Sequence, residues 1–512
     1  MTKKILPAAA LLLAGCTLAP HYAVPGAAIP PSFKEAPGWV PATPADAIAK
    51  GEWWQLFGDP VLDALEVRVA VSNQNVIAAA AAYAQARAAV RETRAALFPT
   101  VDISGDVTRA GSFGRRSTTV IGGTGTTTGT GTGPTTGTGT GTGTGSTGTT
   151  TGTSTTVTTS AGSRRYSLSL GASWEPDLWG RIASGVRQER ALAQASRADL
   201  NNATLSAQGE LAADYVQLRG LDRQKAILDD TIAAYQRNLT ITDNRYRAGV
   251  VARIDVLQAQ TQLTSARADA ADLVRQRQTF EHAIAVLVGE NPSNFSLVPA
   301  RWNPVVPDVP GVLPAALLQR RPDIAGAERR VAASNQAIGV ERAAFFPTID
   351  LSGDLGFNSG KLGALFSAAS SIWSLGLSGA LTLLDFGARS ARVQQARAAY
   401  DQAVANYRQT VLTAFQQVED ELAATQVLGF VGEQRAQAAA AATRVEQLTR
   451  NQYLSGQIAY TDVITQQATA LSARQAEATA VVDRQIAAIT LIQAIGGSWP
   501  SPGILPVVSS VR

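Results

Sequence analysis

Sulfur-containing and histidine side chains are nearly missing from this 512-residue chain, which has one cysteine, one methionine and two histidines. The single cysteine, Cys16, excludes an intramolecular disulfide. Metal sites built from Cys, His or Met side chains are not expected either. The formal net charge is only +4 and the basic residues are scattered, so the sequence shows no basic patch of the kind that binds nucleic acid.

Long apolar runs are missing as well. Beyond the first residues there is no run of eighteen apolar residues, so the sequence predicts no transmembrane helix. The chain begins MTKKILPAAALLLAGC, in which Lys3 and Lys4 precede an apolar stretch, 5–14, that is too short to cross a bilayer. We interpret residues 1–15 as a removable export signal, whose loss would lower the net charge to +2.

The end of this signal, Leu13-Ala14-Gly15-Cys16, resembles the lipobox of bacterial lipoproteins. That resemblance implies cleavage before Cys16 and covalent lipid on it, an S-diacylglycerol and an N-palmitoyl group; no other cofactor is expected. Thr17 follows instead of aspartate, which among lipoproteins favours sorting to the outer membrane. An ordinary signal peptide with a chance cysteine is the alternative.

One sequence segment occurs twice in the chain. RAALFPTVDISGD begins at Arg94, and RAAFFPTIDLSGD begins 248 residues later at Arg342. A second pair, NRYRAGVVARIDVLQAQ from Asn244 and NQYLSGQIAYTDVITQQ from Asn451, is offset by 207. The offset drops by 41 across residues 117–160, a tract of 44 residues made almost only of Thr, Gly and Ser. The chain is therefore an internal duplication, and the tract is an insertion in its first copy that predicts a disordered loop.

Each copy changes from helical to alternating sequence at a Phe-Pro pair, because proline disfavours the helical conformation of the residue before it. Alanine-rich helices are predicted over 72–96 and 322–344, and strands follow them. The apolar positions of these strands and of the two returning strands are Val101, Ile103, Val107; Ile349, Leu351, Leu355, Phe357; Tyr166, Leu168, Leu170, Ala172, Trp174; and Trp373, Leu375, Leu377, Leu381, Leu383. Alternation over roughly 9–11 residues fits tilted strands that cross a bilayer, although a soluble hairpin could show it too.

Four strands cannot close a barrel, and lipid does not tolerate unpaired strand edges. The smallest bacterial barrels have about eight strands. We therefore expect three chains to pool their strands into a 12-stranded trimeric β-barrel.

Two very long helices are predicted over 181–247 and 388–452, each roughly 100 Å long at 1.5 Å per residue. Gly249 and Gly456 follow them, as expected at helix C-termini. Shorter helices are predicted over 253–288 and 461–495. Because the two shorter helices of each copy together match one long helix, they should lie end to end beside it. The irregular sequence of 17–71, 289–321 and the tail from 496 would then gather near mid-length.

The spacing of apolar residues in the long helices is that of a coiled coil, as at Leu228, Ile232, Tyr235 and Leu239. Most other positions are small or polar, which favours the wall of a hollow helical tunnel over a solid bundle. The predicted organisation is a signal peptide (1–15), an N-terminal anchor and equatorial segment (16–71), a first repeat (72–290) with the 117–160 loop, an equatorial connector (291–321), a second repeat (322–495) and a tail (496–512).

Several longer phrases resemble the TolC-like outer-membrane efflux lipoproteins, also called NodT-type factors. They are GEWWQLFGDPVLDALEVRVAVSNQNV from Gly51, RRPDI from Arg320, WEPDLWGR, LLDFGARS and the paired Phe-Pro phrases. The resemblance runs from Cys16 to Trp499 and fails only in the Thr/Gly tract.

This resemblance implies a mixed fold, in which four strands join a 12-stranded trimeric β-barrel that continues into a long α-helical coiled-coil periplasmic tunnel with a mixed equatorial region. It implies a homotrimer lipid-anchored in the cell outer membrane and reaching into the periplasm. The trimer would be the passive exit duct of a tripartite pump, with a periplasmic adaptor and a proton-driven inner-membrane transporter.

The resemblance also implies a periplasmic gate at the two glycine turns, where the adaptor would bind. Family gate carboxylates follow the second turn by six residues, which here gives Asp462 after Gly456, with Asp255 in the equivalent place after Gly249. A tyrosine that pairs with the latter would be Tyr453. Thr465 and Ile458 stand where some members carry a second aspartate and a latch arginine, so the closed mouth would be held differently. Asp255 and Asp462 also fit a plain role as acids at helix N-termini.

An enzyme is not expected, because no Ser-His-Asp set, phosphate loop or metal cluster is recognisable. Arg320, Pro322 and Asp323 fit the start of a helix and are interpreted as structural. A structural or adhesive trimeric coiled-coil protein, and a duct for heavy metals or polypeptides instead of drugs, are the functional alternatives.

Overall fold

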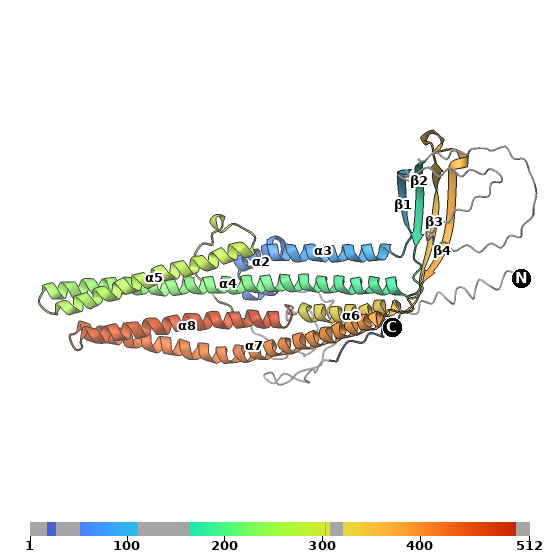
Figure 1. Ribbon diagram of the computed structural model, residues 1–512. Helices are drawn as coiled ribbons and strands as arrows, with labels where there is room; N and C mark the ends of the chain where they lie inside the picture. The colour runs from blue at the N-terminus through green and yellow to red at the C-terminus, as the bar shows by residue number, and fades with distance from the viewer. Residues whose placement is uncertain (1–17, 27–51, 111–162, 303, 308–320, 498–512) are drawn as a thin grey trace, which may run out of the picture. The chain divides into compact units, whose positions relative to one another are not determined.

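The computed structural model describes residues 18–26, 52–110, 163–302, 304–307 and 321–497, which form a helical unit and a separate β-sheet unit (Figure 1). Outside the described residues lie the signal peptide with Cys16, the 117–160 tract, residues 303 and 308–320 of the equatorial connector and nearly all of the tail.

The helical unit contains two copies of one arrangement: in each, a long helix is accompanied by two shorter helices that follow one another along it (Figure 1). This confirms the end-to-end packing predicted from the helix lengths. The first copy consists of α3 (Gln74–Ala95), α4 (Arg181–Arg247) and α5 (Arg253–Leu287), and the second of α6 (Pro322–Ala343), α7 (Ala388–Leu454) and α8 (Tyr460–Ala494). In the described part of the chain, none of these helices has the length and apolar composition of a membrane span.

The prediction that residues 17–71 are irregular is wrong in its last part. A 3₁₀ helix, η1 (Trp53–Phe57), is followed there by α2 (Pro60–Ser72). Asp59 caps α2 by accepting from the backbone amides of Val61 and Leu62, and Pro60 occupies the first turn, where its missing N–H costs nothing. Asn73 then separates α2 from α3.

Asn73 ties three helix ends together from a buried position. Its Oδ1 accepts from the amides of Asn75 and Val76, which caps α3, and its Nδ2 donates to the carbonyl oxygen of Leu287 at 2.9 Å. The end of α5 is thereby fixed to the junction between α2 and α3. The helix α3 therefore starts at Gln74, two residues later than position 72, where the alanine-rich pattern predicts its start.

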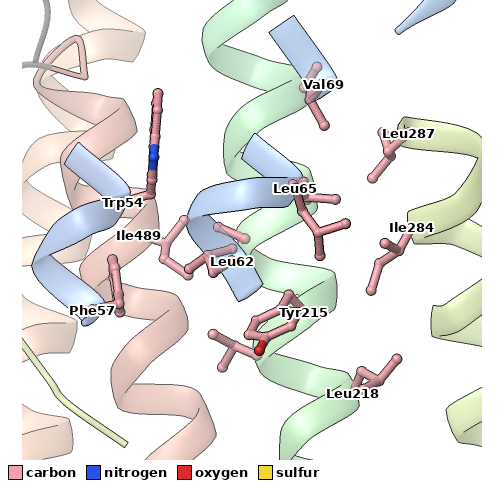
Figure 2. Close-up of a cluster of buried hydrophobic side chains, with 14 of the residues drawn as sticks. Trp54, Phe57, Leu62, Leu65, Val69, Tyr215, Leu218, Ile284, Leu287 and Ile489 are labelled. Carbon is pink, nitrogen blue, oxygen red and sulfur yellow. The ribbon is translucent and has the colours of Figure 1, made fainter. Parts of the chain in front are cut away.

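The main hydrophobic cluster surrounds α2 and lies at the middle of α4, where the short helices meet. Figure 2 shows Leu62, Leu65 and Val69 of α2 next to α4, which carries Tyr215 and Leu218, and side chains of α5 and α8 belong to the same cluster. Burying each large apolar side chain contributes roughly 1.5–3 kcal/mol. This cluster therefore supplies much of the stability of a unit whose long helices otherwise expose much of their surface.

The two copies approach closely where α4 meets α8. A Cβ atom at Gly220 would lie 2.4 Å from Cγ2 of Val482, and one at Gly209 would lie 1.7 Å from Nε2 of Gln493. At Gly220 only a residue without a side chain fits, whereas at Gly209 the flexible end of Gln493 would have to move. Both glycines thus allow the close packing of α4 against α8.

The sheet unit has four antiparallel strands in the order β1-β2-β3-β4: β1 (Thr100–Ala110), β2 (Ser163–Trp174), β3 (Thr348–Ser359) and β4 (Ser371–Ala380). Ile103 pairs with Leu170, Leu170 with Leu355, and Leu355 with Trp373, so one register line is apolar across all four strands. The neighbouring line, Asp102, Gly171, Asp354 and Ser374, is on the opposite face, because successive residues of a strand alternate. The predicted division into an apolar and a polar face is confirmed.

The last strand is shorter than predicted. The alternation continues through Leu381 and Leu383, but β4 ends at Ala380, which pairs with Thr348 at the start of β3. Pro347 precedes that start and has no N–H to donate, so the ladder stops there.

Candidate functional site

The α4–α5 and α7–α8 turns are built alike around a glycine in the left-handed conformation. Gly249 has φ 73° and Gly456 has φ 78°, a region that favours glycine. In the first turn the amide of Val250 donates to the carbonyl oxygen of Arg245, and in the second the amide of Gln457 donates to that of Gln452. These bonds satisfy the last carbonyls of the long helices and reverse the chain within a few residues.

The predicted gate carboxylates both lie in the first turn of the returning helix, Asp255 in α5 and Asp462 in α8. Asp462 is exposed, whereas Asp255 is half-buried. Both positions are favourable for an acid, because the N-terminus of a helix carries a partial positive charge.

Tyr453 is buried at the end of α7, with 7% of its surface exposed. Its ring lies 5.2 Å from that of Tyr460, and both pack with Ala259 and Val463 in a small cluster. The hydroxyl of Tyr453 has no hydrogen-bond partner among the residues that the structure describes. The bond to Asp255 that the family resemblance implied is therefore not formed in this chain.

Asp255 is near enough to Tyr460 to influence the pKa of its hydroxyl. Burial, then the neighbouring tyrosines 453 and 235, then Asp255 raise the pKa of Tyr460 to about 12. The Tyr460 hydroxyl accordingly stays protonated and able to donate a hydrogen bond throughout the neutral range.

Arg245 contacts Tyr453, which the sequence did not predict. Its Nη1 donates to the carbonyl oxygen of Tyr453 at 3.3 Å, and its guanidinium lies 4.9 Å from the centre of the Tyr453 ring. This links the end of α4 to the end of α7. The duplication alone did not predict it, because Tyr246, the repeat equivalent of Tyr453, is 39% exposed in the structure and the two copies have different neighbours.

A second polar cluster, at mid-length, has a structural role. Asp222 accepts from Arg219 at 3.1 Å and from Arg277 at 2.7 Å, and Arg277 also binds Glu281. The two guanidinium groups donate further to the backbone carbonyls of Leu297 and Val298. The buried ions are thus mutually paired, and they fix the connector after α5 to both helices.

The start of α6 agrees with its predicted structural role. Pro322 is in the first helical turn and Asp323 follows it, while Arg320 lies outside the described residues. Arg321, which the sequence interpretation did not single out, pairs with Asp323 at 2.7 Å and donates to the carbonyl oxygen of Ala494 at 2.9 Å. This arginine joins the start of α6 to the end of α8.

These features, two duplicated long-helix hairpins and a four-stranded sheet with one apolar face, are those of a known class of transport protein. The family model described as outer membrane efflux protein matches residues 67–290 and 313–497. Among curated relatives, the probable efflux pump outer membrane protein TtgC of Pseudomonas putida is 28% identical over 508 residues, covering 98% of this chain and 96% of its own length. The cation efflux system protein CusC of Escherichia coli is 27% identical, covering 97% and 99%.

A comparison with solved structures gives the same class of protein. The outer-membrane channel OprN superposes with a TM-score of 0.78 at 27% identity, covering 94% of this chain and all of that one. The chain belongs to the outer membrane efflux protein family and is an outer-membrane transport protein.

Proposed function

We propose that three copies of this chain form the exit duct of a tripartite efflux pump, through which small molecules such as drugs pass from an inner-membrane transporter and a periplasmic adaptor to the exterior. In this proposal the three sheets make one 12-stranded barrel and the helical units make the periplasmic tunnel. The chain conducts passively and catalyses no reaction.

The observation that carries the proposal is the sheet itself. Its apolar face is highly exposed at Ile103 (73%), Trp373 (79%) and Leu377 (74%). In the described part of the chain, its outer strands β1 and β4 each pair on one side only. An exposed apolar face suits lipid, and two open edges in lipid require neighbours of the same kind. A second and a third copy supply these neighbours.

The transported substrate is a separate question. The chain is about equally similar to TtgC, named for an efflux pump, and to CusC, named for cation efflux, at 28% and 27% identity. We place organic molecules first because the equatorial and tip residues offer no set of soft metal ligands: the sequence has one methionine, one cysteine and two histidines. A heavy-metal or polypeptide duct is the second candidate.

The test is to delete the gene in its native host and to measure accumulation of a fluorescent drug, with the wild-type chain restored from a plasmid. Accumulation should rise on deletion and fall on restoration, and the purified chain in detergent should have the mass of a trimer. A stable monomer, or accumulation that changes only for copper or silver, would contradict the proposal as stated.

A lipid anchor on Cys16 fits the placement of the residues that follow it. The carbonyl oxygen of Leu18 accepts from Arg342 at 3.2 Å, and that of Pro20 accepts from Asn335 at 2.9 Å, so the segment lies along α6. Leu18 follows Cys16 by two residues in the sequence, and Arg342 precedes the first residue of β3 by six. Labelled palmitate should enter the wild-type chain and not Cys16→Ala.

Asp462 is proposed as the gate carboxylate because it is exposed in the first turn of α8, directly after the turn at Gly456. Three copies around an axis would repel one another and attract cations. Asp462→Asn should reduce the block of single-channel current by divalent cations, whereas Asp401→Asn, in the body of α7, should leave it unchanged. If divalent cations block the current equally in wild type and in Asp462→Asn, Asp462 is not a gate residue.

A further inference from the structure

A small, partly enclosed cavity lies between α4, α7 and α8, about one to three helical turns from the glycine turns. Its volume is about 10 Å³, which is the space of one water molecule. Asn238 and Thr242 from α4 and Arg450 and Tyr453 from α7 line it, together with Ile241 and Leu454 and with Tyr460 and Val463 of α8.

One atom of each of four lining side chains is buried without a hydrogen bond to any residue that the structure describes: Asn238 Nδ2, Thr242 Oγ1, Arg450 Nε and Tyr453 Oη. Three of these residues are more than nine-tenths buried. Thr242 is unlike Thr231 and Thr240 of the same helix, whose hydroxyls donate to the carbonyl four residues earlier. Thr242 comes close enough to Tyr460 to lower the pKa of that hydroxyl, but the contact does not have hydrogen-bond geometry.

The four atoms complement the hydrogen-bonding capacity of water. Asn238 Nδ2 and Arg450 Nε can only donate, and water accepts two hydrogen bonds. The hydroxyls of Thr242 and Tyr453 can both accept, and water donates two. An anion would satisfy the two nitrogen donors and could also receive both hydroxyls, but a halide is larger than the water that the cavity just fits.

We propose that one ordered water molecule occupies this cavity and joins α4 to α7, and that this bridge helps to hold the helix tips closed. The water gives a partner to the Tyr453 hydroxyl, which the expected bond to Asp255 would otherwise have supplied. Together with the Arg245 contact to the backbone of Tyr453, it is a second tie between the same two helix ends. Its role at the gate rests on the proposed channel function, whereas its presence does not.

The presence of the water is tested by a structure of the detergent-solubilised trimer at a resolution that shows ordered solvent. Density for one oxygen is expected within about 2.7–3.2 Å of Tyr453 Oη, Thr242 Oγ1, Asn238 Nδ2 and Arg450 Nε. Crystals grown in sodium bromide give the competing result: an anomalous bromide peak in the cavity would show an anion site and overturn the proposal. So would an empty cavity or direct bonds among the four groups.

The role of the bridge is tested with Thr242→Val, Tyr453→Phe and the double variant, by measuring the leak current of the closed channel in planar bilayers. Each single variant should raise the leak by about 2- to 10-fold, the effect of one hydrogen bond on an equilibrium. The double variant should add little, because either change alone already breaks the bridge. The repeat-equivalent variants Thr449→Val and Tyr246→Phe are the controls and should leave the leak unchanged.

Leak ratios that multiply in the double variant would mean that the two hydroxyls act independently, which contradicts a shared water. Thermal unfolding of the same trimers separates this outcome from a failure of the proposed function: the coupling between Thr242 and Tyr453 should appear in the unfolding midpoints even if the chain conducts no current. Absence of coupling in both measurements would refute the bridge.

Discussion

At the scale of single residues, the structure places several polar side chains where burial changes their chemistry. Glu66 of α2 is the clearest case. Its side chain is 0% exposed, and neither carboxyl oxygen has a hydrogen-bond partner within the described ranges. Burial, and then the nearby charge of Asp63, raise its pKa to about 9. Glu66 is therefore protonated in the folded chain at neutral pH.

Replacement of Glu66 should show how much its burial destabilises the folded chain. Because the folded pKa lies above the unfolded value, the folded state binds a proton that the unfolded state has lost between pH 4.5 and about 9. Stability is thus lost as pH rises through this window. Glu66→Leu, which fills similar space without a carboxyl, should raise the unfolding midpoint at pH 8, by the equivalent of about 1–3 kcal/mol per chain, and change it much less at pH 5.

The control is Asp229→Asn, at an exposed ion pair with Lys225. It should shift the midpoint by less than about 1 kcal/mol at either pH. A Glu66→Leu protein whose midpoint falls equally at both pH values would show that the carboxyl has a stabilising partner.

At the scale of elements, stability depends on how closely the helices of the two copies approach. The duplication gives both copies the same local sequence pattern, but their packing differs: Tyr453 is buried while Tyr246 is exposed, and α4 approaches α8 most closely at Gly209 and Gly220. The helices are therefore equivalent in length and not in surroundings.

A methyl group at Gly220 tests the α4–α8 contact. In Gly220→Ala the new Cβ would meet Val482, a buried β-branched side chain that cannot rotate away, so the trimer should lose about 1–3 kcal/mol per chain. Gly209→Ala should cost less, because it meets the flexible end of Gln493.

Gly429→Ala is the matched control within α7. Among the described atoms none lies within 4 Å of the added Cβ, so the better helix propensity of alanine should stabilise the chain by up to about 1 kcal/mol. Chemical unfolding of the three variants under the same conditions compares their free energies of unfolding. Equal effects at positions 220 and 429 would mean that the close approach is not present in the assembled protein.

At the scale of the whole molecule, the function depends on which face of the sheet is apolar. Leu375 of β4 lies on the apolar face and is 73% exposed, whereas its neighbour Ser374 lies on the polar face opposite Asp354. Leu375→Arg should lower the amount of trimer in the outer membrane, since an arginine facing lipid near the bilayer centre costs about 2–4 kcal/mol.

Ser374→Arg carries the same charge one residue away and can pair with Asp354 across the strands. It should assemble as wild type, as measured by heat-sensitive trimer bands in outer-membrane fractions. If both variants assemble equally well, the apolar face does not contact lipid and the proposed 12-stranded barrel is refuted.

The sequence alone determined the features that depend on neighbouring residues. The long helices lacked proline and ended at Gly249 and Gly456, the strands alternated after each Phe-Pro pair, and the repeat showed that the halves are alike; all of these are local, so periodicity and single special residues sufficed. The tertiary structure decided what local rules cannot reach. Which of two equivalent tyrosines is buried, why β4 stops at Ala380, and that Arg245 rather than Asp255 contacts Tyr453 all depend on residues far away in the chain. Identical local sequence gives identical backbone, but a side chain's partners are set by whichever helix packs against it.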